Sequence, residues 1–263
     1  ATVNQLTGSG VDPDVLKCIV RWAKTDLTTD LVGEFPTLQG IVGGLYARRE
    51  GASEEISSAI YDQYRPQGLD DRTPASAAGI VLALTDRLDT VFGCFSAGLI
   101  PSGSEDPLGL RRDTQGIIKI LLDHRLGFSF RATIEADGRM TGDVGDSLKA
   151  FYEDRMRHVL GRMGFAYDEI NAVLKTDSDN PANVLDRVEA LHAVRESPDF
   201  LVIAAAFKRI KNILKQSSDS GANAEPVDDT ARMEPAESAL AERIDAIEPQ
   251  VKIWAQAGEY SQA

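Results

Sequence analysis

The segment from residue 75 to residue 99 restricts the fold more than any other feature of this sequence. It is the most apolar stretch of the chain, and small and aliphatic residues occupy most sides of the helix that it would form. A helix that is hydrophobic on most sides lies at the centre of a bundle. We therefore expect a helical bundle built around 75–99.

Helical periodicity continues through most of the remaining chain. Between residues 13 and 32, apolar side chains recur every three or four positions, as on the buried face of an amphipathic helix. Pro36 ends this pattern because a proline disfavours helix at the residue before it. Further helices are expected at 38–49, 53–65, 107–124, 147–163, 167–175, 181–195, 198–215 and 234–257. No run of alternating strand residues is convincing, so the predicted fold class is all-α.

Two segments break the helical pattern. Residues 127–146 are rich in glycine and aspartate and are predicted to be a linker between two helical parts. Residues 216–230 carry almost no large apolar side chains and are predicted to form a flexible loop. In the helix predicted before this loop, an apolar stripe is expected to face a core; it consists of Ile203, Phe207, Ile210 and Leu214.

Several protein classes are excluded by what the sequence lacks. No apolar run approaches the roughly 18 residues that a membrane span needs, and the first residues resemble no signal peptide. Cys18 and Cys94 are the only cysteines, which fits a reducing cytoplasm. No phosphate-binding glycine loop, dinucleotide fingerprint or zinc-binding histidine helix occurs. We expect a cytoplasmic protein without membrane contact, and the absence of an initiator Met suggests a piece of a longer chain.

The charge of the chain is −13, and more than half of it comes from residues 217–249. An acidic total argues against nucleic-acid binding, because affinity for phosphates requires clustered Lys and Arg side chains. One basic cluster is nevertheless present, since 208–215 contains no acid; its cations are Lys208, Arg209, Lys211 and Lys215. Such a face usually only keeps a helix soluble, so the pattern leaves an RNA-binding role open.

Asp26 and Asp86 lie on two of the expected helices, each with a further aspartate within a turn. A carboxylate on a mostly buried helix is costly unless it is paired or binds a metal. Two such helices would suit a metal-dependent phosphohydrolase of the HD type, yet no histidine occurs before His124. The alternative is structural, with both aspartates capping helices or pairing with Arg21 or Arg87.

A serine- and glycine-rich loop with two prolines precedes the helix predicted at 107–124. Asp106 is expected at the N-cap of this helix and the proline after it at the first helical position. Exposed N–H groups at a helix N-terminus suit a phosphate, and Arg111, Arg112 and Lys119 lie on the same helix. An ordinary capped helix with solvated or salt-bridged cations would show the same pattern.

Four segments resemble the beta subunit of the bacterial heterotetrameric glycyl-tRNA synthetase, which is built from two kinds of subunit. They are TDLTTDLVGEFPTLQGIVGGLYA at 25–47, ALTDRLDTVFG at 83–93, GLIPSGSEDPLGLRR at 98–112 and AFKRIKNILK at 206–215. These segments follow the order found in the family, and the resemblance extends over residues 15–258.

The resemblance implies a C-terminal fragment of that subunit, with an HD-like helical bundle followed by a second, incomplete helical domain. The implied parts are an HD-like domain at 1–126, a linker at 127–146, a helical connecting segment at 147–198 and the truncated start of a DALR-type anticodon-binding domain at 199–263. Asp26 and Asp86 would occupy degenerate HD positions, where Thr25 and the missing histidines leave no working metal site. The truncation should leave an apolar face of the last helix uncovered, formed by Leu240, Ile244, Ile247, Val251 and Trp254.

The family joins glycine to tRNA at the expense of ATP, with the adenylate-forming site on the alpha subunit and tRNA recognition on the beta subunit. The resemblance therefore implies no catalytic residue, metal or cofactor in this chain, with ATP and Mg at the alpha subunit. The implied partners are the alpha subunit and tRNA(Gly). The candidate tRNA contacts are Arg111, Arg112, Lys119, Lys208, Arg209, Lys211 and Lys215. Two alternatives stay open: a helical scaffold for alpha-subunit assembly without RNA contact and, less favoured, an HD-type metal phosphohydrolase.

Overall fold

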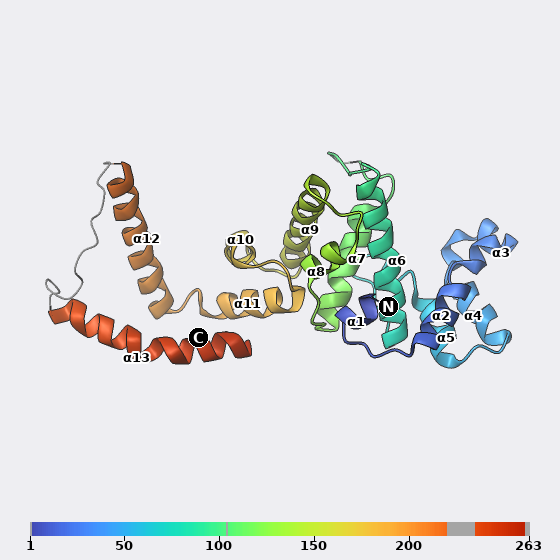
Figure 1. Cartoon of the computed structure of the whole chain (residues 1–263), viewed down its shortest axis with the longest axis horizontal. Helices are drawn as coiled ribbons and strands as arrows, with labels where there is room; N and C mark the ends of the chain where they lie inside the picture. The colour runs from blue at the N-terminus through green and yellow to red at the C-terminus, as the bar shows by residue number, and fades with distance from the viewer. Residues whose placement is uncertain (1, 104, 220–234, 261–263) are drawn as a thin grey trace. The chain divides into compact units, whose positions relative to one another are not determined.

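The computed structural model describes residues 2–103, 105–219 and 235–260 (Figure 1). Within these ranges it contains thirteen α-helices, two 3-10 helices and no strand, which confirms the all-α class. In chain order they are α1 (Thr2–Leu6), α2 (Pro13–Trp22), η1 (Thr25–Thr28), α3 (Asp30–Glu34), η2 (Pro36–Leu38), α4 (Ile41–Arg49), α5 (Glu54–Asp62), α6 (Ala77–Ser96), α7 (Leu110–Asp123), α8 (Phe130–Ala136), α9 (Asp143–Arg162), α10 (Tyr167–Thr176), α11 (Pro181–Val194), α12 (Pro198–Asp219) and α13 (Pro235–Ala257). None of the described helices is long and apolar enough to cross a membrane.

The chain divides into two compact units, Ala1–Leu185 and Asp186–Ala263. In the first unit, α6 is the central helix that its composition predicts. It contacts α5, α7 and α9 as well as the short N-terminal helices (Figure 1). The Ser76 hydroxyl begins the helix by accepting a hydrogen bond from the Gly79 N–H at 3.1 Å. Residues on most sides of α6 are buried, including Leu84, Val91 and Phe95.

The single helix predicted over 13–32 is wrong, because the structure divides this range into α2, η1 and α3. The cause lies in local hydroxyl groups. Thr25 Oγ1 donates to the Trp22 carbonyl at 2.7 Å, and Thr29 Oγ1 donates to the Asp26 carbonyl at 2.6 Å. Such bonds compete with the regular helical ladder. Lys24, at φ 64°, turns the chain between α2 and η1.

Helices α4 and α5 approach each other closely because α4 carries two consecutive glycines. A Cβ atom on Gly44 would lie 2.6 Å from Tyr61 Cβ and 2.7 Å from the Ser57 carbonyl oxygen. Both distances are shorter than real Cβ contacts allow. The backbone of α4 therefore rests directly on α5, and no side chain fits between them at this point.

The segment 127–146, predicted to be a linker, is instead part of the first unit. It forms α8 and the start of α9. Phe130 and Tyr152 are both buried and stack with their ring centroids 3.8 Å apart. Phe130 also meets Phe92 of α6 edge to face at 6.3 Å. A few buried aromatic side chains thus anchor a stretch whose glycine and aspartate content resembles a linker, and the division between units falls inside α11.

In the second unit, α12 and α13 have uncovered apolar faces. The stripe predicted to face a core on α12 is exposed at all four positions, with Phe207 at 70%. That prediction is wrong for the described chain, which buries nothing large on this face. On α13, Leu240, Ile244 and Ile247 are exposed, which confirms the uncovered face expected there at these positions. Helix α12 continues to Asp219, and the rest of the loop predicted at 216–230 lies outside the described residues.

Candidate functional site: a charged cleft and a basic helix

A cleft of about 290 Å³ lies between helices η2, α6 and α7 and the segment 64–67, which follows α5. It brings together Asp86, one of the proposed HD positions, and Arg112, one of the candidate tRNA contacts. The residues that line it are Pro36, Thr37, Gln39, Tyr64, Pro66, Gln67, Asp86, Arg87, Arg112 and Asp113. Carboxylates, guanidinium groups and amides thus share one concave surface in the first unit.

The buried side chain of Arg87 forms part of the lining of this cleft. Its guanidinium donates hydrogen bonds to four backbone carbonyls, those of Gln63 (3.3 Å), Tyr64 (2.9 Å), Pro66 (3.1 Å) and Ala83 (3.2 Å). Burial lowers the pKa of the Arg87 guanidinium, whereas the nearby carboxylates of Asp113 and Asp86 act in the opposite direction. Arg87 therefore ties the segment after α5 to the central helix, a role that the sequence did not reveal.

Asp26 is buried, with only 2% of its surface exposed. Its Oδ2 accepts a hydrogen bond from the Gly40 N–H at 2.6 Å. A Cβ atom on Gly43 would lie 3.1 Å from the carboxylate, so α4 packs directly against it. Burial raises the pKa of the Tyr64 hydroxyl, and the charges of Asp26 and Asp86 raise it further. The two carboxylates therefore act on the same tyrosine.

Asp86 forms an ion pair with Lys24 rather than with either arginine that the sequence offered. Asp89, one turn along α6, binds Arg139 at 3.0 Å. Among the described residues, no group of three or more His, Cys, Asp or Glu side chains could hold a metal ion. Both proposed HD aspartates therefore have structural partners, Gly40 for Asp26 and Lys24 for Asp86.

The N-terminus of α7 differs from its prediction. The helix begins at Leu110, after Gly109 at φ 70°, and not at Pro107. The Asp106 carboxylate nevertheless caps it, accepting from the Leu110 N–H at 2.9 Å and the Arg111 N–H at 2.8 Å. These are the N–H groups that were expected to suit a phosphate. An internal carboxylate already occupies the position of that anion.

The three cations of α7 have different surroundings. The Arg111 guanidinium donates to the carbonyls of Gly103 at 2.7 Å and Glu105 at 2.8 Å, so it supports its own loop. Arg112 lines the charged cleft. Lys119 pairs with Asp123, one turn along the helix, at 2.9 Å. Arg112 is thus the α7 cation that the cleft presents to a ligand.

Replacing the capping carboxylate tests this account of α7. We expect Asp106→Ala to lower the free energy of unfolding by about 1–2 kcal/mol, because two N–H groups lose their acceptor. Glu105→Ala is the matched control, since Glu105 contributes its carbonyl rather than its carboxylate to the loop. Urea unfolding followed by circular dichroism measures both. Equal stability of the two variants would contradict capping by Asp106.

The remaining candidate cations lie on α12. Lys208, Arg209, Lys211 and Lys215 are all exposed. Within the described part of the chain, no ion pair or side-chain hydrogen bond engages any of them. All four lie within the eight residues 208–215, which include no acidic residue. Of the two basic candidate regions, α12 is therefore the one whose charges are collectively available to a partner.

A family model described as "Glycyl-tRNA synthetase beta subunit" matches residues 4–175. The chain is 41% identical over 256 residues to the glycine–tRNA ligase beta subunit of Acidobacterium capsulatum, covering 93% of this chain and 36% of that protein. It is 37% identical over 256 residues to the corresponding subunit of Janthinobacterium sp., covering 96% of this chain and 36% of that protein. For the subunit of Leptothrix cholodnii the identity is 39% over 243 residues, with 91% and 34% covered.

The chain spans about a third of the length of these relatives. The family model itself covers most of the first unit, including the charged cleft, whereas the relatives extend the match into the second unit. The match therefore includes both basic candidate regions. On this evidence the chain belongs to the family of glycyl-tRNA synthetase beta subunits.

Proposed function

We propose that this chain is a tRNA-recognition part of a glycine–tRNA ligase beta subunit. It supports the ATP-dependent attachment of glycine to tRNA(Gly), while the adenylate-forming site, with its ATP and Mg, belongs to an alpha subunit. The relatives bear the name of that ligase subunit. The proposed partners are the alpha subunit and tRNA(Gly), and the proposed setting is the cytoplasm, where the unpaired thiols of Cys18 and Cys94 stay reduced.

The observation that carries the RNA-binding role is the basic face of α12. Four exposed cations without partners among the described residues can release counterions from a phosphate backbone, which is the main source of affinity for nucleic acid. The proposal further takes residues 1–126 as a helical scaffold derived from an HD domain. It takes residues 199–263 as the start of a DALR-type anticodon-binding domain.

Salt dependence tests RNA binding directly. We expect the chain to bind tRNA(Gly) more tightly than an unrelated tRNA. Its affinity should fall about 100-fold between 50 and 200 mM salt if four phosphates are contacted. Fluorescence anisotropy with labelled tRNA measures both quantities. Binding without salt sensitivity would contradict a phosphate-based interface.

Charge reversal locates the interface. Lys208→Glu combined with Lys211→Glu should weaken tRNA binding at least tenfold at 50 mM salt and reduce the salt slope by about two, one for each lost phosphate contact. Lys175→Glu is the matched control, because Lys175 is an exposed cation of α10 in the first unit. An equal loss in the control would show a general charge effect instead of a local contact.

The exposed apolar faces of α12 and α13 favour a second candidate, a scaffold for the alpha subunit without RNA contact. Under this alternative the chain co-purifies with the alpha subunit, and the double charge reversal leaves that association unchanged. Absence of binding to either tRNA would favour the scaffold over tRNA recognition.

A further inference from the structure

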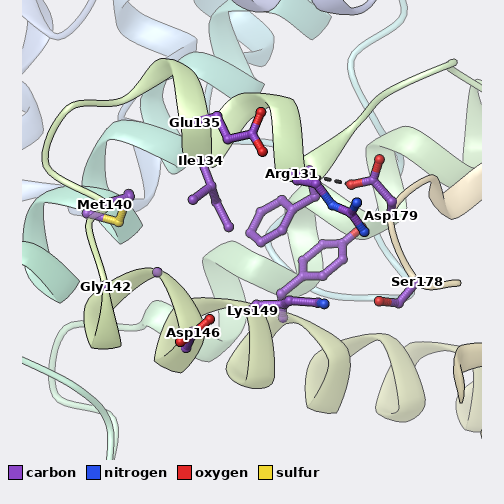
Figure 2. A pocket seen from close by; sticks show the side chains of 12 residues that line it. Arg131, Ile134, Glu135, Met140, Gly142, Asp146, Lys149, Ser178 and Asp179 are labelled. Atoms are coloured by element: carbon purple, nitrogen blue, oxygen red, sulfur yellow. Dashed lines mark hydrogen bonds between the residues drawn. The ribbon is translucent and has the colours of Figure 1, made fainter.

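A second pocket, with a volume of about 360 Å³, lies within the first unit between α8, the loop after it, α9 and the segment that precedes α11 (Figure 2). Its lining residues are Phe130, Arg131, Ile134, Glu135, Met140, Gly142, Gly145, Asp146, Lys149, Tyr152, Ser178 and Asp179. Its volume falls within the range of about 300–1,000 Å³ that is typical of small-molecule sites. The pocket shares no lining residue with the charged cleft at Arg87.

The apolar side of this pocket is held in place by a defined set of contacts. Phe130 and Tyr152 stack on each other and are both buried. Asp179 fixes the start of α8, because its carboxylate accepts from the Arg131 N–H at 2.6 Å and from Ser129 Oγ at 2.7 Å. Its carbonyl also accepts from the Phe130 N–H at 3.2 Å. Ligand sites of this kind combine a preformed apolar surface with a few placed polar groups.

Two cations, Arg131 and Lys149, and three carboxylates, Glu135, Asp146 and Asp179, line the pocket. In the view of Figure 2, the Arg131 and Lys149 side chains reach toward the end where Ser178 lies, whereas Asp146 lies toward Met140 and Glu135 projects from α8. Both cations are exposed, and within the described chain neither side chain has an ion pair or hydrogen bond. The Asp179 carboxylate lies beside Arg131 at the same end, where it already accepts from the Arg131 N–H and from Ser129 Oγ. This end therefore offers two cations and one engaged carboxylate to an anion, and the rest of the lining offers Glu135 and Asp146 as acceptors to a hydrogen-bond donor.

We propose that this pocket binds a single nucleotide whose base carries an amino group. The phosphate lies between Arg131 and Lys149, since a guanidinium and an ammonium both donate charge-assisted hydrogen bonds to phosphate oxygens. The flat base lies against Ile134 and the Phe130–Tyr152 stack. Glu135 or Asp146 accepts a hydrogen bond from the amino group of the base, as carboxylates do with cytosine in nucleic-acid complexes.

Two sources present this chemistry: a free mononucleotide and an unstacked nucleotide within a single strand of RNA. Bases in single-stranded RNA can be splayed out and bound on apolar and aromatic side chains, whereas bases in a duplex cannot reach such a pocket. The RNA source rests on the proposed function, but the mononucleotide source does not. Matched probes distinguish them, namely AMP, an octamer of adenylate, and the same octamer paired with octauridylate.

The decisive experiment titrates the 263-residue chain with AMP, IMP and adenosine, using NMR chemical shifts to detect weak binding. We expect AMP to bind, and IMP and adenosine to bind about tenfold more weakly, because IMP lacks the amino group and adenosine the phosphate. Arg131→Gln and Lys149→Gln should each weaken AMP binding about tenfold. Lys175→Gln, at an exposed cation outside the pocket, is the control that should change nothing. Thermal unfolding of each variant verifies that it is folded.

Each result has a definite meaning. AMP binding that both pocket variants weaken supports a mononucleotide site, and single-strand binding that they weaken, without measurable AMP binding, supports the RNA source. The proposal is overturned if neither AMP nor the single-stranded octamer binds saturably, or if Arg131→Gln and Lys149→Gln both leave the binding unchanged. Binding of tRNA that survives this failure leaves the proposed function intact. AMP binding that the pocket variants weaken, without any tRNA binding, supports the pocket proposal and contradicts the proposed function.

Discussion

Gly44→Ala should lower the free energy of unfolding of the first unit by about 3 kcal/mol, at the upper end of the cost of overpacking. The added methyl group would lie 2.6 Å from Tyr61 Cβ, 2.7 Å from the Ser57 carbonyl and 2.9 Å from Tyr61 Cα. These atoms belong to or adjoin the backbone of α5, so no rotation of a side chain relieves the clash. The two helices must separate along their contact, which loses packing on both sides.

The same substitution in an open position provides the control. Gly93 lies inside α6, and a Cβ atom there would meet only Arg139 Nη1, at an ordinary distance of 3.7 Å. Because alanine costs less conformational entropy than glycine in a helix, Gly93→Ala should stabilise by about 0.5–1 kcal/mol. Hydrogen exchange of the α5 and α6 amides, measured by mass spectrometry, reports both changes. Unchanged protection in Gly44→Ala would contradict the close backbone contact.

Arg87→Met is expected to have an effect of similar size, a loss of about 3 kcal/mol or more in the free energy of unfolding. Methionine fills much of the same volume but donates no hydrogen bond, so the carbonyls of Gln63, Tyr64 and Pro66 lose a buried donor. A buried polar group without a partner costs about 1–3 kcal/mol each. Arg87→Lys should recover only part of the loss, because an ammonium cannot reproduce the planar fork of a guanidinium.

Arg49→Met is the matched control for this prediction. Arg49 is exposed on α4, so its substitution should change stability by less than about 0.5 kcal/mol. Urea unfolding of the three variants gives the comparison. If Arg87→Met were as stable as Arg49→Met, the four carbonyl contacts of Arg87 would contribute nothing to the fold.

The elements that could be predicted from the sequence are those defined by long apolar periodicity. Helix α6 and its central place followed from its composition, and α5 begins after Ser53 as its cap predicts. The break at Thr25 and the later start of α7 could not be predicted in this way, because the first depends on threonine hydroxyl bonds and the positive φ of Lys24, and the second on the positive φ of Gly109. The spacing of apolar residues carries no information about the backbone conformation of a single turn residue.

In the candidate site, too, some residues could be predicted from the sequence and others could not. The α12 cations could be predicted as a group because one helix carries them all within eight positions. The charged cleft could not, since it joins Asp86 to Arg112 from different helices around Arg87. An arginine in the middle of the most apolar helix was the available signal for Arg87. Its partners are backbone carbonyls, which sequence patterns do not identify.

The stack of Phe130 on Tyr152 also determines where this chain can be divided for expression. A cut between 130 and 146 separates Tyr152 from Phe130, and a cut between 127 and 129 separates Phe92 from the stacked pair, so either one exposes an aromatic ring that is buried in the whole chain. Fragments whose ends are placed in this stretch because its composition resembles a linker would therefore aggregate and be poorly soluble. A division placed after α11, just before Pro198, keeps all three rings in one polypeptide.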